Sequence, residues 1–361
     1  MKIREAIKGL NMYQAGKPIS EVKRELGLTD VIKLASNENP LGCSEKVKKV
    51  MMEAAEEINL YPDASNFELK RALSEHLGVD TKRIFCGTGS DLLIRVICNL
   101  FLDPGDEIIM GGVSFQRYED SAQIMGAKTV KIPMKNHRLD VEAMVNAINE
   151  KTRIIWFCTP NNPTGAMVTK SELFSVLDRI PEDVIIVMDE AYYEYVTDEE
   201  YPQTLPLIDK YPNMIILRTF SKAYGLAGLR VGYGIANEEI TKYINSILGP
   251  FDTNLIAQAA AITALKDKDF LKKAVETNTT GREYFYREFD RLGLEYIISQ
   301  ANFVMVNVGR DDKDVFNKLL RKGVIVRPGH LFGMNNWLRV SVGTMDQNER
   351  FINELENLLK E

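Results

Sequence analysis

The sequence predicts an α/β protein with a large sheet domain and a smaller second domain, and two observations support this prediction. Through the middle of the chain, short apolar runs alternate with longer amphipathic stretches, a pattern typical of a mostly parallel sheet flanked by helices. The chain has 361 residues, more than one compact core usually holds. We therefore expect a large α/β domain at residues 41–250, a small α+β domain at residues 251–361, and an N-terminal arm at residues 1–40 that completes the small domain.

Each strand of the large domain is expected where an apolar run is bounded by polar turn residues. These runs occupy residues 84–86, 107–110, 129–132, 153–158, 184–188, 214–217 and 231–235. Helices are expected between them, at residues 91–102, 118–125, 141–148 and 170–178. Thr169, with Glu172 three residues later, predicts a capping box at the start of the last of these helices. For the small domain we expect helices at 271–292 and 347–359 and strands at 303–308, 324–326 and 337–342.

Composition excludes several classes of function. The formal net charge of -6 argues against a nucleic-acid or anionic-membrane surface as the main partner. No apolar run approaches the length of a membrane span, and the N-terminus lacks the apolar stretch of a secretory signal, so we expect a cytoplasmic protein. The four cysteines form no C-x-x-C pair and the three histidines are far apart, so no metal site or disulfide framework is indicated.

The strongest chemical signal is the stretch at residues 219–230, TFSKAYGLAGLR, which follows an apolar strand. Lys222 therefore lies at the carboxyl end of a strand, where α/β sheets place their ligands, and is a candidate Schiff-base former. The hydroxyls of Thr219 and Ser221, together with Arg230, can hold a phosphate beside it. A lone lysine after a strand is usually a surface residue, but the combination of hydroxyls, lysine, glycines and arginine favours a site.

A second signal is Asp189, which ends a buried apolar run, with Tyr192 three residues later. A carboxylate in this position can pair with a protonated ring nitrogen of a cofactor. Taken alone, an acid at a strand end more often caps the next helix. A metal-binding or Walker-B acid is the other alternative, but the chain has no G-x-x-x-x-G-K-[ST] loop.

Two loops add weaker signals. The segment TPNNPTG at residues 159–165 also follows a strand, and its prolines and glycine predict a stiff loop that can present the Asn162 amide to a ligand. The segment GTGSD at residues 87–91 joins a strand to a helix, and its small residues allow backbone N–H groups to approach a phosphate. Either loop alone is equally well explained as a structural turn.

These four motifs, in this order, resemble those of the fold-type I pyridoxal-phosphate enzymes, the aspartate aminotransferase family. Further matches at residues 18–27, 33–42, 61–63 and 337–344 resemble the histidinol-phosphate aminotransferases within that family. The resemblance spans nearly the whole chain. It implies pyridoxal 5'-phosphate as cofactor and a homodimer.

The resemblance also implies a role for individual residues at the cofactor. Lys222 would carry the cofactor as a Schiff base and then move the substrate proton. Asp189 would pair with the pyridine nitrogen, Tyr192 and Asn162 would hold the phenolate oxygen, and Phe115 would stack on the ring. The remaining cofactor-binding positions, mostly at the phosphate, would be Gly89, Ser90, Asp91, Thr219, Ser221 and Arg230.

At the substrate, the resemblance implies contacts from Tyr13, Asn39, Arg327 and Arg339, whereas His330 is left without a role. Tyr61 would reach the cofactor phosphate of the partner subunit. The implied reaction is a ping-pong exchange of an amino group between L-histidinol phosphate and 2-oxoglutarate, giving imidazole acetol phosphate and glutamate in histidine biosynthesis.

Three alternatives stay open at this stage. An aromatic or aspartate aminotransferase and a threonine-phosphate decarboxylase share this fold and most of these motifs. The third alternative is a non-catalytic regulator with an aminotransferase-like domain. Against the regulator stand the intact Lys222 and the lack of a basic or helix-turn-helix extension before the motifs.

Overall fold

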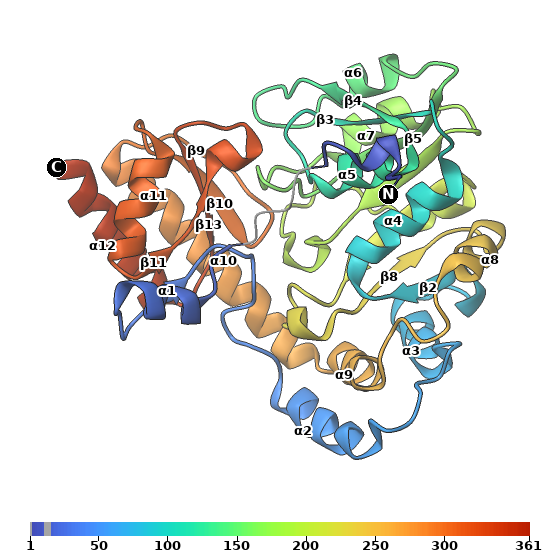
Figure 1. The fold of residues 1–361 in the computed structure, drawn as a ribbon, viewed down its shortest axis with the longest axis horizontal. Helices are drawn as coiled ribbons and strands as arrows, with labels where there is room; N and C mark the ends of the chain where they lie inside the picture. The colour runs from blue at the N-terminus through green and yellow to red at the C-terminus, as the bar shows by residue number, and fades with distance from the viewer. Residues whose placement is uncertain (1, 11–15) are drawn as a thin grey trace.

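The computed structural model describes residues 2–10 and 16–361, which form two lobes, each built around its own sheet. The larger lobe contains a seven-stranded sheet and the smaller lobe a four-stranded one. The long helix α10 (Lys268–Leu292) runs from the base of the larger lobe into the smaller one (Figure 1).

The seven-stranded sheet is mixed but mostly parallel, which confirms the predicted fold class. Its strand order is β2-β8-β7-β6-β5-β3-β4, and only β8 runs antiparallel to its neighbours. The strands are β2 (Ile84–Gly87), β3 (Glu107–Gly111), β4 (Lys128–Ile132), β5 (Thr152–Cys158), β6 (Ile185–Asp189), β7 (Met214–Thr219) and β8 (Gly232–Ile235). Each lies within about two residues of its predicted run.

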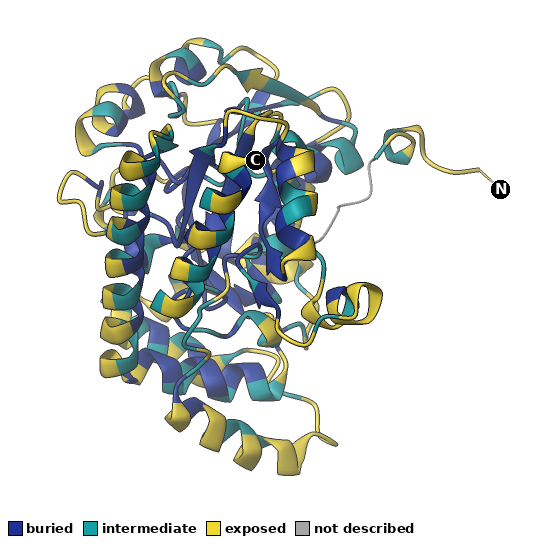
Figure 2. Ribbon diagram, turned by 90° about the vertical axis from the view of Figure 1, so that its left-hand side faces the viewer, coloured by how far each residue is buried: buried dark blue, intermediate teal, exposed yellow. Residues whose placement is uncertain are grey.

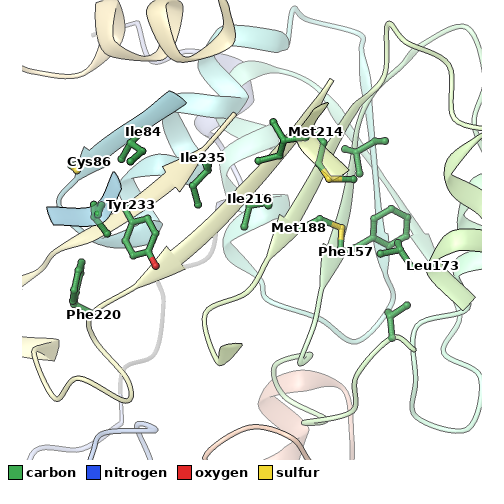
Figure 3. Packing of buried hydrophobic residues seen from close by; sticks show 14 of the residues in the cluster. Ile84, Cys86, Phe157, Leu173, Met188, Met214, Ile216, Phe220, Tyr233 and Ile235 are labelled. Atoms are coloured by element: carbon green, nitrogen blue, oxygen red, sulfur yellow. The ribbon is translucent and has the colours of Figure 1, made fainter. Parts of the chain in front are cut away.

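Both faces of this sheet are buried, which explains why its strands read as continuous apolar runs. Because successive side chains point to opposite faces, Trp156 and Phe157 of β5 enter two different hydrophobic clusters. Figure 3 shows the cluster on the Phe157 face, where Met188 and Ile216 pack beside it from the two following strands. The core of the larger lobe therefore consists of two apolar layers separated by the sheet.

Helices cover each face, and their outer sides are exposed while the strands are buried (Figure 2). The Trp156 face is covered by α4 (Gly89–Phe101), α5 (Arg117–Met125) and α8 (Glu238–Ile247). The Phe157 face is covered by α2 (Glu45–Ala54), α3 (Phe67–Leu77), α6 (Val141–Asn146), α7 (Lys170–Leu177) and α9 (Leu255–Lys266). The capping box of Thr169 and Glu172 at the start of α7 is confirmed. Helices α2, α3, α8 and α9 were not predicted.

The smaller lobe has an antiparallel sheet in the order β12-β13-β10-β9, covered by three helices. Its elements are β9 (Tyr296–Ile297), β10 (Phe303–Asn307), α11 (Asp312–Arg321), β12 (Arg327–Pro328), β13 (Trp337–Ser341) and α12 (Met345–Lys360), together with α10. Six short 3-10 helices lie in the connections that the structure describes: η2 (Ala55–Glu57), η3 (Thr81–Arg83), η4 (Tyr193–Tyr195), η5 (Leu205–Asp209), η6 (Ala227–Leu229) and η7 (Gly329–Phe332).

The N-terminal segment contacts both lobes. Its strand β1 (Ile32–Lys33) pairs in parallel with β11 (Val324–Ile325), and α1 (Ile19–Leu26) lies beside the smaller lobe (Figure 1). The first turn, η1 (Glu5–Ile7), lies instead against α5 of the larger lobe, where Nη2 of Arg4 donates a hydrogen bond to the carbonyl of Ile124. The expectation that the whole arm joins the small domain therefore describes only its second half.

Candidate active site

One cavity at the carboxyl edge of the larger sheet gathers most of the predicted site residues. This edge is where open α/β sheets place ligands, because the loops after successive parallel strands converge there. The smaller lobe closes the cavity with residues of β12 and β13. The predicted residues that line the cavity are Ser90, Asp91, Phe115, Asn162, Asp189, Tyr192, Thr219, Ser221, Lys222, Arg230, Arg327 and Arg339.

Lys222 lies three residues after β7, in the interior of the cavity. Burial, and then the positive charge of Arg339, lower the pKa of the Lys222 ammonium from 10.5 to about 8. Its Nζ lies 5.6 Å from the centre of the Tyr192 ring. A lysine with this lowered pKa has a substantial neutral fraction near neutral pH, which is the form that attacks carbonyl carbons and accepts protons.

Asp189 ends β6 with a side chain that is only 3% exposed. Burial raises the pKa of its carboxyl group to about 6, although two hydrogen bonds act in the opposite direction. The Tyr118 hydroxyl donates to Oδ2 at 2.5 Å, and the backbone N–H of Ala191 donates to Oδ1 at 3.2 Å. The carboxylate is therefore held from behind and faces the cavity.

Tyr192 is positioned by a residue that the sequence analysis missed. The amide Nδ2 of Asn37 donates a 3.0 Å hydrogen bond to the Tyr192 hydroxyl. Asn37 is itself fixed, because the Ser341 hydroxyl donates to its Oδ1 at 3.0 Å and accepts from its backbone N–H at 2.8 Å. It has a left-handed backbone with a φ of 55°, a conformation that asparagine tolerates better than most residues.

Asn39 does not line this cavity, although it was the expected substrate contact from the same segment. Its Nδ2 donates to the carbonyl of Ala223 at 2.8 Å and its Oδ1 accepts from the N–H of Leu41 at 2.9 Å. The amide therefore braces the loop beside Lys222, and Asn37 is the asparagine of this segment that lines the cavity. The signal was present in the Asn-Glu-Asn sequence, but spacing alone does not tell which asparagine points inward.

A cradle suited to a phosphate lies at the start of α4. Gly89 has a φ of +75°, and a Cβ built there would lie 2.7 Å from Nη2 of Arg230. Nη1 of Arg230 lies 3.3 Å from the Ser221 hydroxyl, and Ser90 also lines the cavity. A glycine at a helix N-terminus facing a guanidinium group leaves room for an anion bound by backbone N–H groups. The residues present therefore fit a phosphate group.

Asp91, in the first turn of α4, is occupied by ion pairs. Its carboxylate lies 2.7 Å from Nε of Arg117 and 3.1 Å from Nη2 of Arg95. The side chain therefore ties α4 to α5, while a carboxylate in this position also suits the helix N-terminus.

Two arginines of the smaller sheet project into the cavity side by side. Arg327 and Arg339 are direct partners in the antiparallel pairing of β12 with β13, so their side chains leave the same face. Both are buried, and their guanidinium carbons lie 5.9 and 5.1 Å from the centre of the Phe332 ring. One aromatic ring thus orients both cations.

His330 is a brace for the turn that carries Phe332. Its Nδ1 lies 2.6 Å from Oδ2 of Asp312, and its backbone N–H donates to the same oxygen at 2.9 Å. The N–H of Asn336 donates to Oδ1 of Asp312 at 3.1 Å. The buried carboxylate of Asp312 therefore binds both ends of the segment between β12 and β13. His330, for which the sequence indicated no role, stabilises this segment.

Tyr61 lies outside the cavity of its own chain. Its side chain is 81% exposed and stacks on Phe251 with ring centres 4.5 Å apart. The remaining predicted contact, Tyr13, falls outside the described residues.

Within residues 2–10 and 16–361, no helix is long and apolar enough to cross a membrane.

The lysine, the buried carboxylate and the phosphate-binding residues lie together at one edge of the sheet. Comparisons with known proteins identify the family to which the chain belongs. The sequence pattern of the family "Aminotransferase class I and II" matches residues 29–355, and the chain belongs to this family. It is 49% identical to the histidinol-phosphate aminotransferase of Geobacillus sp. (strain WCH70), over 100% of this chain and 99% of the relative. It is also 49% identical to the histidinol-phosphate aminotransferase of Caldicellulosiruptor saccharolyticus, over 99% of both chains.

A solved structure shows the same architecture. The histidinol-phosphate aminotransferase of Sinorhizobium meliloti, in complex with pyridoxal-5'-phosphate, superposes with a TM-score of 0.92 and 28% sequence identity, over 99% of this chain and 98% of that one.

Proposed function

We propose that this protein transfers the amino group of L-histidinol phosphate to 2-oxoglutarate, with pyridoxal 5'-phosphate as cofactor, in histidine biosynthesis. The products are imidazole acetol phosphate and glutamate. The observation that carries the proposal is the meeting of Lys222, Asp189 and the Gly89–Arg230 cradle around one cavity. The relatives with 49% identity over the full chain support the choice of substrate.

The residues around the cavity fit the cofactor part by part. Arg230, Ser221, Thr219, Ser90 and the N–H groups beside Gly89 would hold its phosphate. Asp189 would hold the ring nitrogen, and Phe115 would lie against the ring. Tyr192 would donate to the phenolate oxygen, as would Nδ2 of Asn162, whose Oδ1 accepts from Arg339. When bound, the cofactor supplies an electron sink for the carbanion at the substrate carbon.

Among the side chains of this protein, Lys222 would carry out most of the chemistry. Its neutral Nζ would form the covalent link to the cofactor, give up that link to the substrate amine, and then take the proton from the carbon that bears the amino group. The lowered pKa of about 8 makes this nitrogen a base that is partly neutral near neutral pH. Asp189, as a carboxylate, would keep the ring nitrogen protonated throughout.

Arg327 and Arg339 would receive the phosphate end of histidinol phosphate. A phosphate ester carries about -1.5 to -2 charge near neutral pH and presents three acceptor oxygens, which suits two neighbouring guanidinium groups. The same pair would bind a carboxylate of 2-oxoglutarate in the second half of the cycle. The imidazole end needs a polar partner. The candidates are Tyr13 and, in place of Asn39, Asn37, which lines the cavity.

Assembly and domain organisation are part of the same proposal. We infer a homodimer in which Tyr61 reaches the cofactor phosphate of the partner subunit. The apolar, exposed side chains of Ile58, Leu60 and Phe67, near Tyr61 in the sequence, support this assembly. We also infer two domains. The larger one runs from residue 41 through α9, which packs into its core, rather than to residue 250 as expected, and the smaller one takes the rest of the chain together with residues 16–40.

A transamination screen tests the proposal. The purified protein is incubated with 2-oxoglutarate and, separately, histidinol phosphate, phenylalanine, aspartate or threonine phosphate, while glutamate and carbon dioxide are measured. We expect glutamate with histidinol phosphate as the preferred donor and no carbon dioxide from threonine phosphate. Borohydride reduction should leave the pyridoxyl mass on the peptide that contains Lys222, and Lys222→Ala should abolish turnover. A preference for an amino acid, or labelling of another lysine in an active Lys222→Ala variant, would overturn the assignment.

A further inference from the structure

Asp189 is held by a tyrosine that was not among the expected site residues. We propose that Tyr118 is a positioning residue whose hydroxyl holds the Asp189 carboxylate in its charged form, so that the proton shared with the cofactor resides on the ring nitrogen. This inference rests on the proposed function, because it concerns the same cofactor.

The position of Tyr118 is determined by ring packing on two sides. Its side chain is fully buried in α5, and its ring stacks on Trp156 of β5 with centres 4.3 Å apart and planes 11° from parallel. The edge of Phe115 meets it at 5.7 Å and 84°. A ring held in this way directs the hydroxyl toward Oδ2 of Asp189, at 2.5 Å, with the buried Cys158 thiol also beside it.

The bond from Tyr118 is the shorter of the two hydrogen bonds that the Asp189 carboxylate accepts. The N–H of Ala191 donates to Oδ1 at 3.2 Å, which is longer than a good N–H···O hydrogen bond usually is. Among charged groups, Glu190 raises the pKa of Asp189 and Lys222 lowers it. Glu190 is in turn neutralised by Arg218, at 2.9 Å. The Tyr118 hydroxyl is therefore the strongest local donor to Asp189.

The chemical consequence follows from competition for one proton. A carboxylate that accepts a strong hydrogen bond is a weaker base, because the bond stabilises its charged form. Burial raises the pKa of Asp189 and the Tyr118 bond opposes this rise, and the resulting pKa of about 6 is near the basicity of a pyridine ring. Without the hydroxyl, the proton between Asp189 and the ring nitrogen would move toward Asp189. A neutral ring is the poorer electron sink.

The segment that leads into α5 would therefore act on the cofactor in two ways. Phe115 would lie against its ring, and Tyr118, three residues later, would act on its nitrogen through Asp189. The spacing of three places both aromatic side chains on one side of the start of α5, where they touch each other.

The test measures where the proton lies rather than how fast the enzyme turns over. The wild type and Tyr118→Phe are reconstituted with cofactor labelled with nitrogen-15 in its ring, and the nitrogen chemical shift is recorded at one pH. Phenylalanine preserves the packing on Trp156 and removes only the hydroxyl. Tyr286→Phe is the matched control, since its hydroxyl bonds the backbone of Ser299 in the smaller lobe, at 2.8 and 3.2 Å.

We expect the ring-nitrogen shift of Tyr118→Phe to move toward that of an unprotonated pyridine, while Tyr286→Phe keeps the wild-type shift. If Tyr118→Phe does not fold, p-aminophenylalanine in place of Tyr118 retains the ring with a weaker N–H donor and should shift the signal in the same direction.

An unchanged nitrogen shift in Tyr118→Phe, or in the p-aminophenylalanine variant where that one is needed, overturns the inference, even if either variant is less stable. Failure of the wild type to bind the cofactor would instead overturn the proposed function. The two failures are therefore distinguishable in one set of samples.

Discussion

Nη1 of Arg339 donates a 2.6 Å hydrogen bond to Oδ1 of Asn162, and this bond joins the four-stranded sheet to the loop after β5 of the seven-stranded sheet. Nη2 of the same arginine donates to the carbonyl of Ala35 at 2.8 Å. One guanidinium group thus holds three segments that are far apart in the sequence. Because Asn162 and Arg339 both line the cavity, its shape depends on how the two lobes meet.

Cofactor capture should depend on pH through Lys222. The amine reacts in its neutral form, and its pKa is lowered to about 8, so the rate constant for binding pyridoxal phosphate to the apo-protein should rise with pH and level off above about 8. Rapid mixing with absorbance detection measures this rate constant. Since the charge of Arg339 contributes to the lowered pKa, Arg339→Gln should move the midpoint upward. A wild-type midpoint near 10.5, as for an exposed lysine, would contradict the prediction.

Arg327→Lys should weaken phosphorylated substrates selectively. A lysine keeps the positive charge but does not reproduce the planar fork, and it also loses the contact with Phe332. We expect kcat/KM for histidinol phosphate to fall roughly ten- to a hundredfold, while the much lower value for unphosphorylated histidinol changes little. The comparison requires both substrates in both proteins. Equal constants for the two substrates in the wild type would refute the substrate assignment and leave the aminotransferase assignment standing.

Tyr61→Phe should weaken cofactor binding without disrupting the fold. The exposed Tyr61 ring rests on Phe251, and phenylalanine preserves that stacking while removing the hydroxyl proposed to reach the phosphate of the partner subunit. The loss of one hydrogen bond to a charged group corresponds to roughly 1.5–3 kcal/mol. Titration of the apo-protein with cofactor measures the effect, and sedimentation at the assay concentration should show a dimer. A fully active monomer is the outcome that excludes this role.

Glu190→Gln should strongly destabilise the larger lobe. Glu190 is completely buried and forms an ion pair with the buried Arg218 at 2.9 Å, so the variant leaves a positive charge uncompensated in the core. Removing one partner of a buried pair typically costs about 3–5 kcal/mol. Urea unfolding at one protein concentration measures the change in apparent free energy of unfolding.

The matched control for this stability measurement is Asp178→Ala, which breaks the exposed pair of Asp178 with Lys210, whose side chains are 69% and 60% exposed. Exposed pairs contribute about 0–1 kcal/mol, so this variant should unfold close to the wild type. Similar losses in the two variants would show that burial of the Glu190–Arg218 pair does not determine its contribution.

The sequence by itself determined the larger lobe and the polar residues that follow its strands. A strand buried on both faces must be apolar along its whole length, so β5, β6 and β7 are recognisable from their composition alone. The polar residues that end or closely follow such runs, Asp189 and Lys222 among them, lie at the carboxyl edge. Their convergence in one cavity follows from the parallel arrangement and needs no knowledge of side-chain contacts.

Only the tertiary structure decided which side chains complete the site. Tyr118 and Asp189 are 71 residues apart, Asn37 and Tyr192 are 155 apart, and each pair meets because two elements pack in one register. A one-residue difference in register or helix rotation would present other side chains, as the exchange of Asn39 for Asn37 illustrates. Local patterns record the period of a strand or helix, whereas a contact between distant segments depends on how the whole core packs, and that information resides in no single stretch of the sequence.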